Sequence, residues 1–172
     1  MNKDSLQSSI ESHIDFPKKG IVFRDVLPIL RDPKIFNTLI EDMSSLNICK
    51  VADSILAVDA RGFIFGSAVA FKLSKPLVVA RKPGKLPGNL ITSSYALEYG
   101  ENSLSIQKES IKNFNSFIII DDLLATGGTV NSIAELLYNE KKIITGLSTV
   151  IELSELNGRS RFDFPVISQI KY

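Results

Sequence analysis

Short, largely apolar segments alternate with segments of helix length along this chain, and this alternation limits the fold more than any other feature. The apolar segments span residues 54–58, 76–80, 117–120, 143–151 and 166–170. Helical spacing of apolar residues predicts helices over 62–73 and 129–138 between them. A strand that is apolar at every position is buried on both faces, as in a parallel sheet covered by helices. The sequence therefore predicts an α/β fold with a central, mostly parallel sheet and helices on both faces.

The N-terminal third predicts two further helices. Leu6, Ile10 and Ile14 recur at four-residue spacing, which predicts one helix that continues to Ile14. Asp32 followed by Pro33 predicts the start of a second helix, because an acidic N-cap and a proline in the first turn are both favoured there. The length of 172 residues, without a linker-like stretch, predicts a single domain over 1–172.

Composition excludes several classes of protein. No apolar run approaches the roughly 20 residues that a membrane-spanning helix needs, so we expect no membrane partner. A net charge of +1 gives no overall attraction to nucleic acid, and none is expected as a partner. The N-terminus lacks the pattern of a secretory signal, and the single cysteine, Cys49, has no partner for an internal disulfide. These features predict a cytoplasmic protein.

Polar residues follow three of the predicted strands, at 59–61, 81–82 and 121–122. Open parallel sheets bind ligands beyond the carboxyl ends of their strands. Residues 121–122 lead into residues 125–129, whose small side chains let backbone N–H groups approach an anion. The positive end of the dipole of the following helix would also attract an anion. No lysine or arginine occurs between Lys112 and Lys141, so this is not a Walker A loop.

Asp121 and Asp122 stand directly before this predicted anion site. Two adjacent carboxylates repel each other unless cations or hydroxyl donors lie near them. Vicinal hydroxyls of a sugar whose 5′-phosphate occupies the loop would meet this need. An acidic pair or a small-residue turn alone is more often only a solvated turn, but their combination between a buried strand and an amphipathic helix favours a phosphosugar site.

Residues 82–107 form a long, polar, glycine-bearing stretch. Its segments 95–98 and 104–106 predict a hairpin around residues 99–102. An excursion of this kind from a compact sheet is often a flexible active-site lid.

Residues 118–129 resemble the phosphoribosyl-pyrophosphate signature of the type I phosphoribosyltransferase family. Within that family, residues 22–25, 59–63, 81–87 and 95–100 are similar to those of the adenine-specific members, and in the same order. The resemblance implies the type I phosphoribosyltransferase fold, with a small N-terminal hood and a flexible lid hairpin. It also implies an enzyme of purine salvage that transfers the phosphoribosyl group from phosphoribosyl pyrophosphate to adenine, giving AMP and pyrophosphate.

The resemblance assigns roles to particular residues. The ribose hydroxyls and the 5′-phosphate would be held by Asp121, Asp122, Ala125, Thr126, Gly127, Gly128 and Thr129. Pyrophosphate would be held by Arg61, Arg81, Lys82 and Lys85, adenine by Val22, Phe23 and Arg24, and catalysis would depend on Glu98 as the acid or base together with Arg61 and Lys82. Tyr99 would lie on the lid.

The resemblance further implies a magnesium ion that substrate oxygens hold, without a direct protein ligand. It implies a homodimer in which Arg81 reaches the neighbouring site, and often a cis peptide at residues 59–60. Alternatives stay open at this point. The acceptor could be another purine, such as hypoxanthine or xanthine, or the chain could be a non-catalytic regulator that senses phosphoribosyl pyrophosphate. Phe23 could belong to the core, and Glu98 could be an exposed strand residue.

Overall fold

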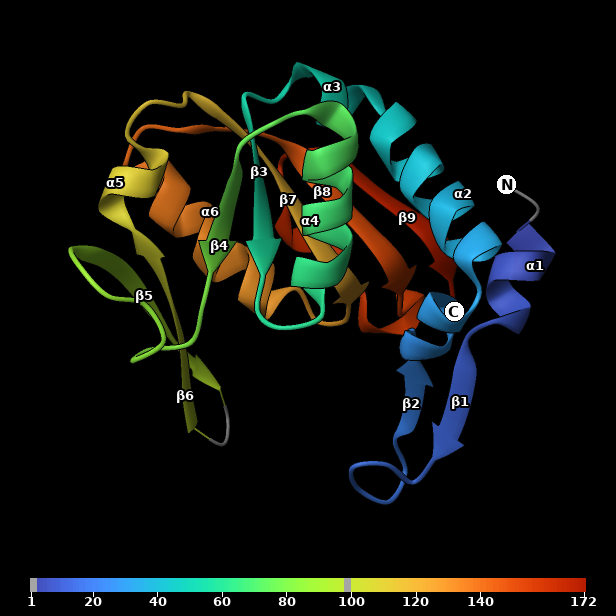
Figure 1. The fold of residues 1–172 in the computed structure, drawn as a ribbon. Helices are drawn as coiled ribbons and strands as arrows, with labels where there is room; N and C mark the ends of the chain where they lie inside the picture. The colour runs from blue at the N-terminus through green and yellow to red at the C-terminus, as the bar shows by residue number, and fades with distance from the viewer. Residues whose placement is uncertain (1–2, 98–99) are drawn as a thin grey trace.

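The computed structural model describes residues 3–97 and 100–172, and a five-stranded parallel sheet forms its centre (Figure 1). The strand order is β4-β3-β7-β8-β9, with bounds Leu77–Ala80, Ser54–Val58, Ser116–Leu124, Ile143–Glu152 and Val166–Lys171. All four pairings are parallel, which confirms the predicted fold class. Strand β7 continues to Leu124, so Asp121 and Asp122 lie inside it and not after it.

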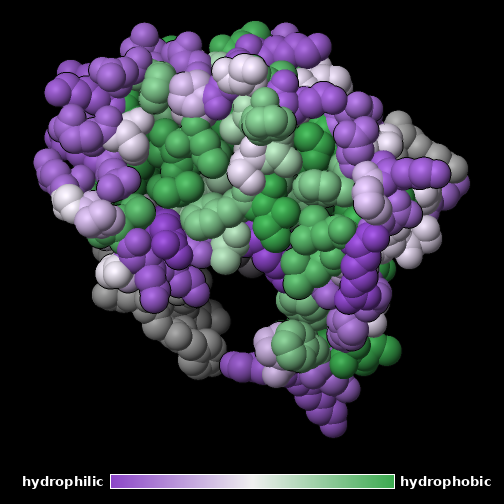
Figure 2. Space-filling model, in the orientation of Figure 1, coloured by the Kyte–Doolittle hydropathy of each residue, from purple (hydrophilic) through white to green (hydrophobic). Residues whose placement is uncertain are grey.

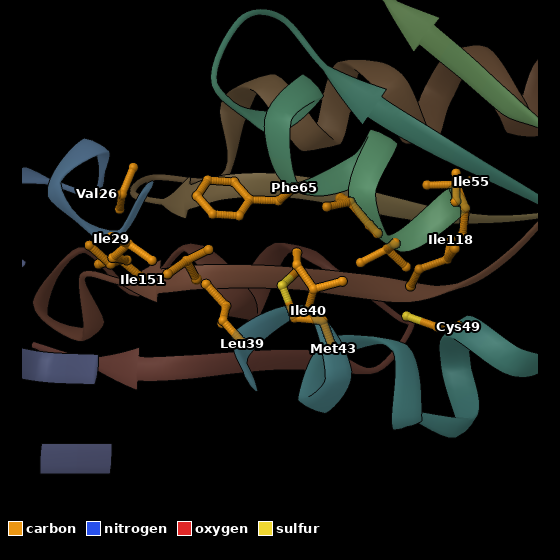
Figure 3. Close-up of a cluster of buried hydrophobic side chains, with 14 of the residues drawn as sticks. Val26, Ile29, Leu39, Ile40, Met43, Cys49, Ile55, Phe65, Ile118 and Ile151 are labelled. Atoms are coloured by element: carbon orange, nitrogen blue, oxygen red, sulfur yellow. The ribbon is translucent and has the colours of Figure 1, made fainter. Parts of the chain in front are cut away.

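Helices cover both faces of this sheet. Helices α2 (Pro33–Ser45), α3 (Asn47–Val51) and α4 (Gly62–Leu73) pack on one face, and α5 (Lys108–Ile111) and α6 (Gly128–Asn139) on the other. Figure 3 shows Leu39, Ile40 and Met43 of α2 beside Ile55, Phe65 and Ile118. Ile118 packs on this face, whereas its neighbour Ile119 packs on the α6 side, and for this reason consecutive residues of the central strands are apolar.

Helix α2 begins where the sequence predicts. The Asp32 carboxylate accepts hydrogen bonds from the backbone N–H groups of Lys34 (2.9 Å) and Ile35 (3.2 Å). These bonds satisfy donors that have no partner within the helix, and Pro33 lacks the N–H that would need one. Buried residues of α2 then face the sheet.

The N-terminal segment differs from the predicted helix. Helix α1 spans only Lys3–Ser8, and β1 (Glu11–Ile14) pairs antiparallel with β2 (Val22–Asp25). Leu6 and Ile10 reach the core, but Ile14 is 79% exposed, so no apolar contact favours a longer helix. Backbone pairing with β2 prevails instead. We call residues 11–25 the hood; it extends beyond the carboxyl ends of the central strands (Figure 1).

A second antiparallel hairpin, β5 (Leu90–Leu97) with β6 (Gly100–Gln107), confirms that this stretch forms a hairpin. The predicted turn at 99–102 is wrong, because residues 100–102 belong to β6 and pair with residues 95–97. Its strands are longer than expected, and β6 is joined to the sheet by a bridge between Ser105 and Arg81. The remaining short elements are the 3-10 helices η1 (Leu27–Arg31), η2 (Ser154–Leu156) and η3 (Gly158–Arg161). Within the described part of the chain, no helix is long and apolar enough to cross a bilayer.

Candidate active site

Residues 125–127, here called the β7–α6 loop, connect the buried strand β7 to the start of α6. Arg61 and residues 121–130 line a cavity of about 190 Å³ at this point. Gly127 is the N-cap of α6 with φ of +81°, a left-handed conformation that suits glycine, and it offers no capping side chain to the helix. The cavity therefore faces a helix N-terminus whose N–H groups are available to an anion.

Backbone contact with η3 fixes this loop from behind. A Cβ atom on Gly127 would lie 2.8 Å from the carbonyl oxygen of Gly158, and one on Gly158 would overlap the carbonyl oxygen of Ala125. Two glycines thus meet where no side chain fits. The sequence prediction did not include Gly158, because a glycine about 30 residues from the loop carries no local signal.

The two carboxyl groups of the acidic pair are both buried, with 8% of Asp121 and 6% of Asp122 exposed. Asp121 Oδ1 accepts a hydrogen bond from the Asp122 backbone N–H at 2.8 Å. Burial, followed by the charge of Asp122, raises the pKa of Asp121 well above its usual value. A carboxyl group can donate a hydrogen bond when it is protonated and only accepts hydrogen bonds when it is ionised.

Arg61 balances the second carboxylate. Its Nε lies 2.6 Å from Asp122 Oδ2, and this buried oxygen accepts no hydrogen bond from the described residues. Gly62 follows at the start of α4, where a Cβ atom would lie 2.9 Å from Asp121 Oδ1. The absence of a side chain at Gly62 therefore lets α4 bring Arg61 close to the acidic pair.

A second cavity, of about 600 Å³, lies under the hood. Its lining residues are His13, Ile14, Asp15, Phe16, Phe23, Asp25, Leu27 and Arg61. Arg61 therefore borders both cavities, and its Cζ lies 5.0 Å from the centre of the Phe23 ring. Phe16 meets the same ring edge-to-face at 5.2 Å. Phe23 is half-buried and lines a cavity, so it is not a core side chain.

The other two residues predicted to hold adenine do not line this cavity with their side chains. Arg24 donates to Ser12 Oγ at 2.5 Å and lies 3.9 Å from the ring centre of Tyr172. The Val22 side chain is exposed. Their backbone groups belong to β2, next to Phe23.

The remaining predicted basic residues gather at the ends of β3 and β4. Arg81 Nε and the Lys82 backbone N–H lie 3.3 and 3.4 Å from Asp59 Oδ2, while Lys85 is exposed beyond them. The Asp59–Ala60 peptide is cis. Arg61 alone of the four predicted pyrophosphate residues lines the β7–α6 cavity. The other two predicted positions, Glu98 and Tyr99, lie outside the described residues.

One group of potential metal ligands occurs in residues 3–97 and 100–172, and it lies on the hood. Glu11, His13 and Asp25 offer ligand atoms within 4.8 Å of one another. At the β7–α6 cavity, Asp122 is paired with Arg61, and the pKa of Asp121 is raised by burial and by the charge of Asp122. This donor set suits hydroxyl groups better than direct coordination of a hard cation, which prefers ionised oxygens.

Comparison with known proteins decides the family. A family model of the phosphoribosyl transferase domain matches residues 34–168. An adenine phosphoribosyltransferase of Prochlorococcus marinus (strain MIT 9215) is 63% identical over 172 residues, which is 100% of both chains. The chain belongs to the adenine phosphoribosyltransferase family.

Solved structures of this family have the same fold. The adenine phosphoribosyltransferase of Thermoanaerobacter pseudethanolicus is 40% identical, with a TM-score of 0.93 over 99% of this chain and 100% of that one. The Saccharomyces cerevisiae enzyme, in complex with adenine and an imino-altritol bisphosphate, is 34% identical, with a TM-score of 0.88 over 98% of each chain. These matches confirm the resemblance seen in the sequence.

Proposed function

We propose that this protein transfers the 5-phosphoribosyl group of phosphoribosyl pyrophosphate to adenine, giving AMP and pyrophosphate in purine salvage. The observation that carries the proposal is that Arg61 borders both the β7–α6 cavity and the hood cavity. A phosphosugar in one cavity and a flat base in the other would meet beside this side chain. The complex of the yeast relative with adenine supports this choice of base.

The 5′-phosphate would occupy the β7–α6 cavity. Backbone N–H groups at the start of α6 and the positive end of its dipole would hold the anion, with the hydroxyl groups of Thr126 and Thr129. Asp121 and Asp122 would bind the ribose diol. The buried Oδ2 of Asp122, which accepts no hydrogen bond from the described residues, supports this role because a ribose hydroxyl could donate to it.

Adenine would lie in the hood cavity on the ring of Phe23, with backbone groups of Val22 and Arg24 at its polar edge. The cation of Arg61 already lies 5.0 Å from the centre of this ring. A ring that lines a cavity of about 600 Å³ supports a stacking contact with a purine. Glu98 would exchange the proton that adenine loses as the new C–N bond forms.

Breaking the anomeric C–O bond develops positive charge on the sugar and negative charge on pyrophosphate, as in glycoside cleavage. Fixed positive charge near the leaving group stabilises that transition state. Arg61 and Lys82 would supply it, with Lys85 binding the same pyrophosphate and Arg81 binding the pyrophosphate of the neighbouring site. Since Arg81 is paired with Asp59 at 3.3 Å, it has to exchange this partner for the phosphate in order to take part.

A magnesium ion would be held by substrate oxygens and water, and when bound it would neutralise charge on pyrophosphate. The pairing of Asp122 with Arg61 supports this arrangement, because a carboxylate already paired with a guanidinium group is a poor ligand for a hard cation.

We also propose a cytoplasmic homodimer in which Arg81 reaches the neighbouring site. Helix α4 is mostly apolar, and its exposed residues are Ser67, Lys72 and Phe71, of which Phe71 is 88% exposed. Figure 2 shows an apolar surface over this part of the molecule. An exposed apolar surface of this kind is typical of a protein–protein contact, which supports a second subunit here. The single cysteine, Cys49, is buried and free, in agreement with a reducing compartment.

One assay tests the reaction. Protein, magnesium and phosphoribosyl pyrophosphate are mixed in parallel with adenine, guanine or hypoxanthine, and pyrophosphate release is measured. We expect release with adenine and formation of AMP. Faster pyrophosphate release with hypoxanthine than with adenine would show that hypoxanthine is the acceptor. Binding of phosphoribosyl pyrophosphate without turnover of any base would indicate a regulator.

A further inference from the structure

The 3-10 helix η3, outside both cavities, packs on the β7–α6 loop through backbone atoms. A Cβ atom on Gly158 would lie 3.0 Å from the backbone nitrogen of Gly127, besides overlapping the carbonyl oxygen of Ala125. On the loop side, a Cβ atom on Gly127 would meet the Gly158 carbonyl oxygen and the Phe162 ring. The Arg161 side chain of η3 also lies against Gly127, but the Gly158 backbone contacts the loop backbone directly, so a displacement of η3 is passed to the loop.

An ion pair between the buried Glu152 and the partly exposed Arg159 holds η3 in place. Arg159, the residue after Gly158, donates from Nε to Glu152 Oε1 and from Nη2 to Glu152 Oε2, both at 2.5 Å. Ser168 Oγ of β9 donates to Oε2 at 2.6 Å, and 2% of Glu152 is exposed. Bidentate pairing with a buried carboxylate fixes both the distance and the orientation of the guanidinium group.

The same glutamate also lies next to the root of the loop. Glu152 ends β8 opposite Leu124, the last residue of β7, and the Leu153 N–H donates to the Leu124 carbonyl oxygen at 2.9 Å. The strand that leads into the loop and the helix that packs behind it are thus both tied to the end of β8.

A loop made of small residues has no large side chains with which to fix its own conformation. Its N–H groups bind an anion well only if they are already oriented toward it, because ordering them on binding costs affinity. We propose that Glu152 and Arg159 are positioning residues that act through Gly158 to hold the β7–α6 loop in its anion-binding conformation. This inference rests on the proposed function, in which the loop binds the 5′-phosphate.

Arg159 does not line the β7–α6 cavity, so a direct contact with the ligand is not part of the proposal. A purely structural role for the pair would lower stability and leave phosphate binding by the folded protein unchanged. A positioning role predicts a loss that is specific to ligands with a 5′-phosphate.

The test measures the affinity of the full-length protein for ribose 5-phosphate by calorimetry, at a temperature where every variant is folded. For Arg159→Ala we expect the Kd to rise by about ten-fold or more. In kinetics, the KM for phosphoribosyl pyrophosphate should rise while the KM for adenine stays within about two-fold. Arg159→Lys keeps the charge but loses the bidentate geometry, and it should lie between Arg159→Ala and the unchanged protein.

Two control variants separate the positioning role of Arg159 from a general effect of charge near Glu152 and from a general loss of stability. Lys171→Ala removes a cation that lies 3.9 Å from the same carboxylate but is not part of η3, and it should leave the Kd within about two-fold. Ile40→Val weakens the core in α2, away from the loop, and it should lower stability without changing the Kd.

Unchanged ribose 5-phosphate affinity in folded Arg159→Ala and Arg159→Lys would overturn the inference, as would equal losses in both controls. So would a starting protein that binds no ribose 5-phosphate. Binding is measured without adenine, so the result does not depend on the proposed reaction. A protein that binds ribose 5-phosphate through this loop but forms no AMP would overturn the proposed function and not the positioning role.

Discussion

The β7–α6 loop and the hood border cavities that share Arg61, but they are built differently. The loop follows a strand that is buried through Asp122, and it packs on η3. In the hood, all four residues of β1 are exposed. The contrast is clearest at two glycines with positive φ: Gly127 is surrounded by backbone and ring atoms, whereas a Cβ atom on Gly20 would have no neighbour within 4 Å.

This difference suggests two ways of binding a ligand. The loop is held by contacts that exist without substrate, so binding an anion requires little ordering. The hood is held by one short strand pair, by the contact between Phe16 and Phe23, and by a few side-chain contacts to the rest of the chain, such as Arg24 with Tyr172. It leaves Ile14 and Phe16 exposed. Segments with few buried contacts open at low free-energy cost. We therefore expect changes in the loop to affect phosphate binding strongly and changes in the hood to affect base binding moderately.

The largest effect is expected from Gly127→Ala. The new methyl group would clash with the Gly158 carbonyl oxygen at 2.8 Å, on a backbone whose φ of +81° already disfavours alanine. Moving the loop to relieve this clash misplaces its N–H groups, and we expect kcat/KM for phosphoribosyl pyrophosphate to fall by more than about 100-fold. Steady-state kinetics with both substrates measure the effect.

Gly20→Ala is the matched control in the hood. Its φ of +87° carries the same conformational cost of about 1–2 kcal/mol, but no atom would meet the methyl group. We expect a small loss of stability and nearly unchanged kinetics for phosphoribosyl pyrophosphate. Similar kinetic losses in both variants would remove the distinction between the two regions.

The second prediction concerns Glu152, which lies behind the loop. Hydrogen bonds from Arg159 lower the pKa of Glu152 to about 2. A carboxyl group whose folded-state pKa is depressed adds stability above its unfolded value of about 4.5, and this stability is lost as the pH falls through about 2. Allowing for the part-exposed Arg159, we expect Glu152→Gln to lower the free energy of unfolding at pH 7 by about 2 kcal/mol.

Urea unfolding as a function of pH measures this effect. The difference between Glu152→Gln and the unchanged protein should shrink between pH 4.5 and 2. Glu109→Gln, at an exposed pair with Lys112, should show almost no difference at any pH. A Glu152→Gln difference that does not depend on pH would mean that the ion pair is not its cause.

The third prediction tests the hood. Phe23→Ala removes the ring that lines the hood cavity, and we expect the KM for adenine to rise by about ten-fold, with a much smaller change for phosphoribosyl pyrophosphate. Ile21→Ala removes an exposed apolar side chain of the hood that does not line the cavity, and it should have little effect on either KM. An equal rise in both KM values for Phe23→Ala would show that the ring supports the whole site and not the base alone.

The central sheet and the β7–α6 loop could be predicted from the sequence better than the hood. The central strands and helices α4 and α6 depend on neighbours in the sequence and on a core that makes apolar periodicity visible, and their presence is confirmed. Strand β7 is longer than predicted, since it continues through Asp121 and Asp122 to Leu124. The predicted N-terminal helix wrongly includes the first strand of the hood, up to Ile14. Four-residue spacing of apolar residues does not show that this segment has a partner strand. Gly158, the pairing of Arg61 with Asp122 and the pairing of Arg159 with Glu152 depend on contacts between distant segments, for which a single sequence has no local pattern.

The smallest expected effect is a gain in stability from Asp121→Asn. Burial and the charge of Asp122 raise the pKa of Asp121, so stability is lost as the pH rises from the unfolded value of 3.8 through the higher folded value. Asparagine keeps an oxygen that can accept the Asp122 N–H but carries no charge. We expect about 1 kcal/mol more stability at pH 7, equal stability near pH 3, and slower turnover. A gain that is the same at both pH values would come from packing, and a loss at pH 7 would show that the Asp121 charge is compensated in the folded protein.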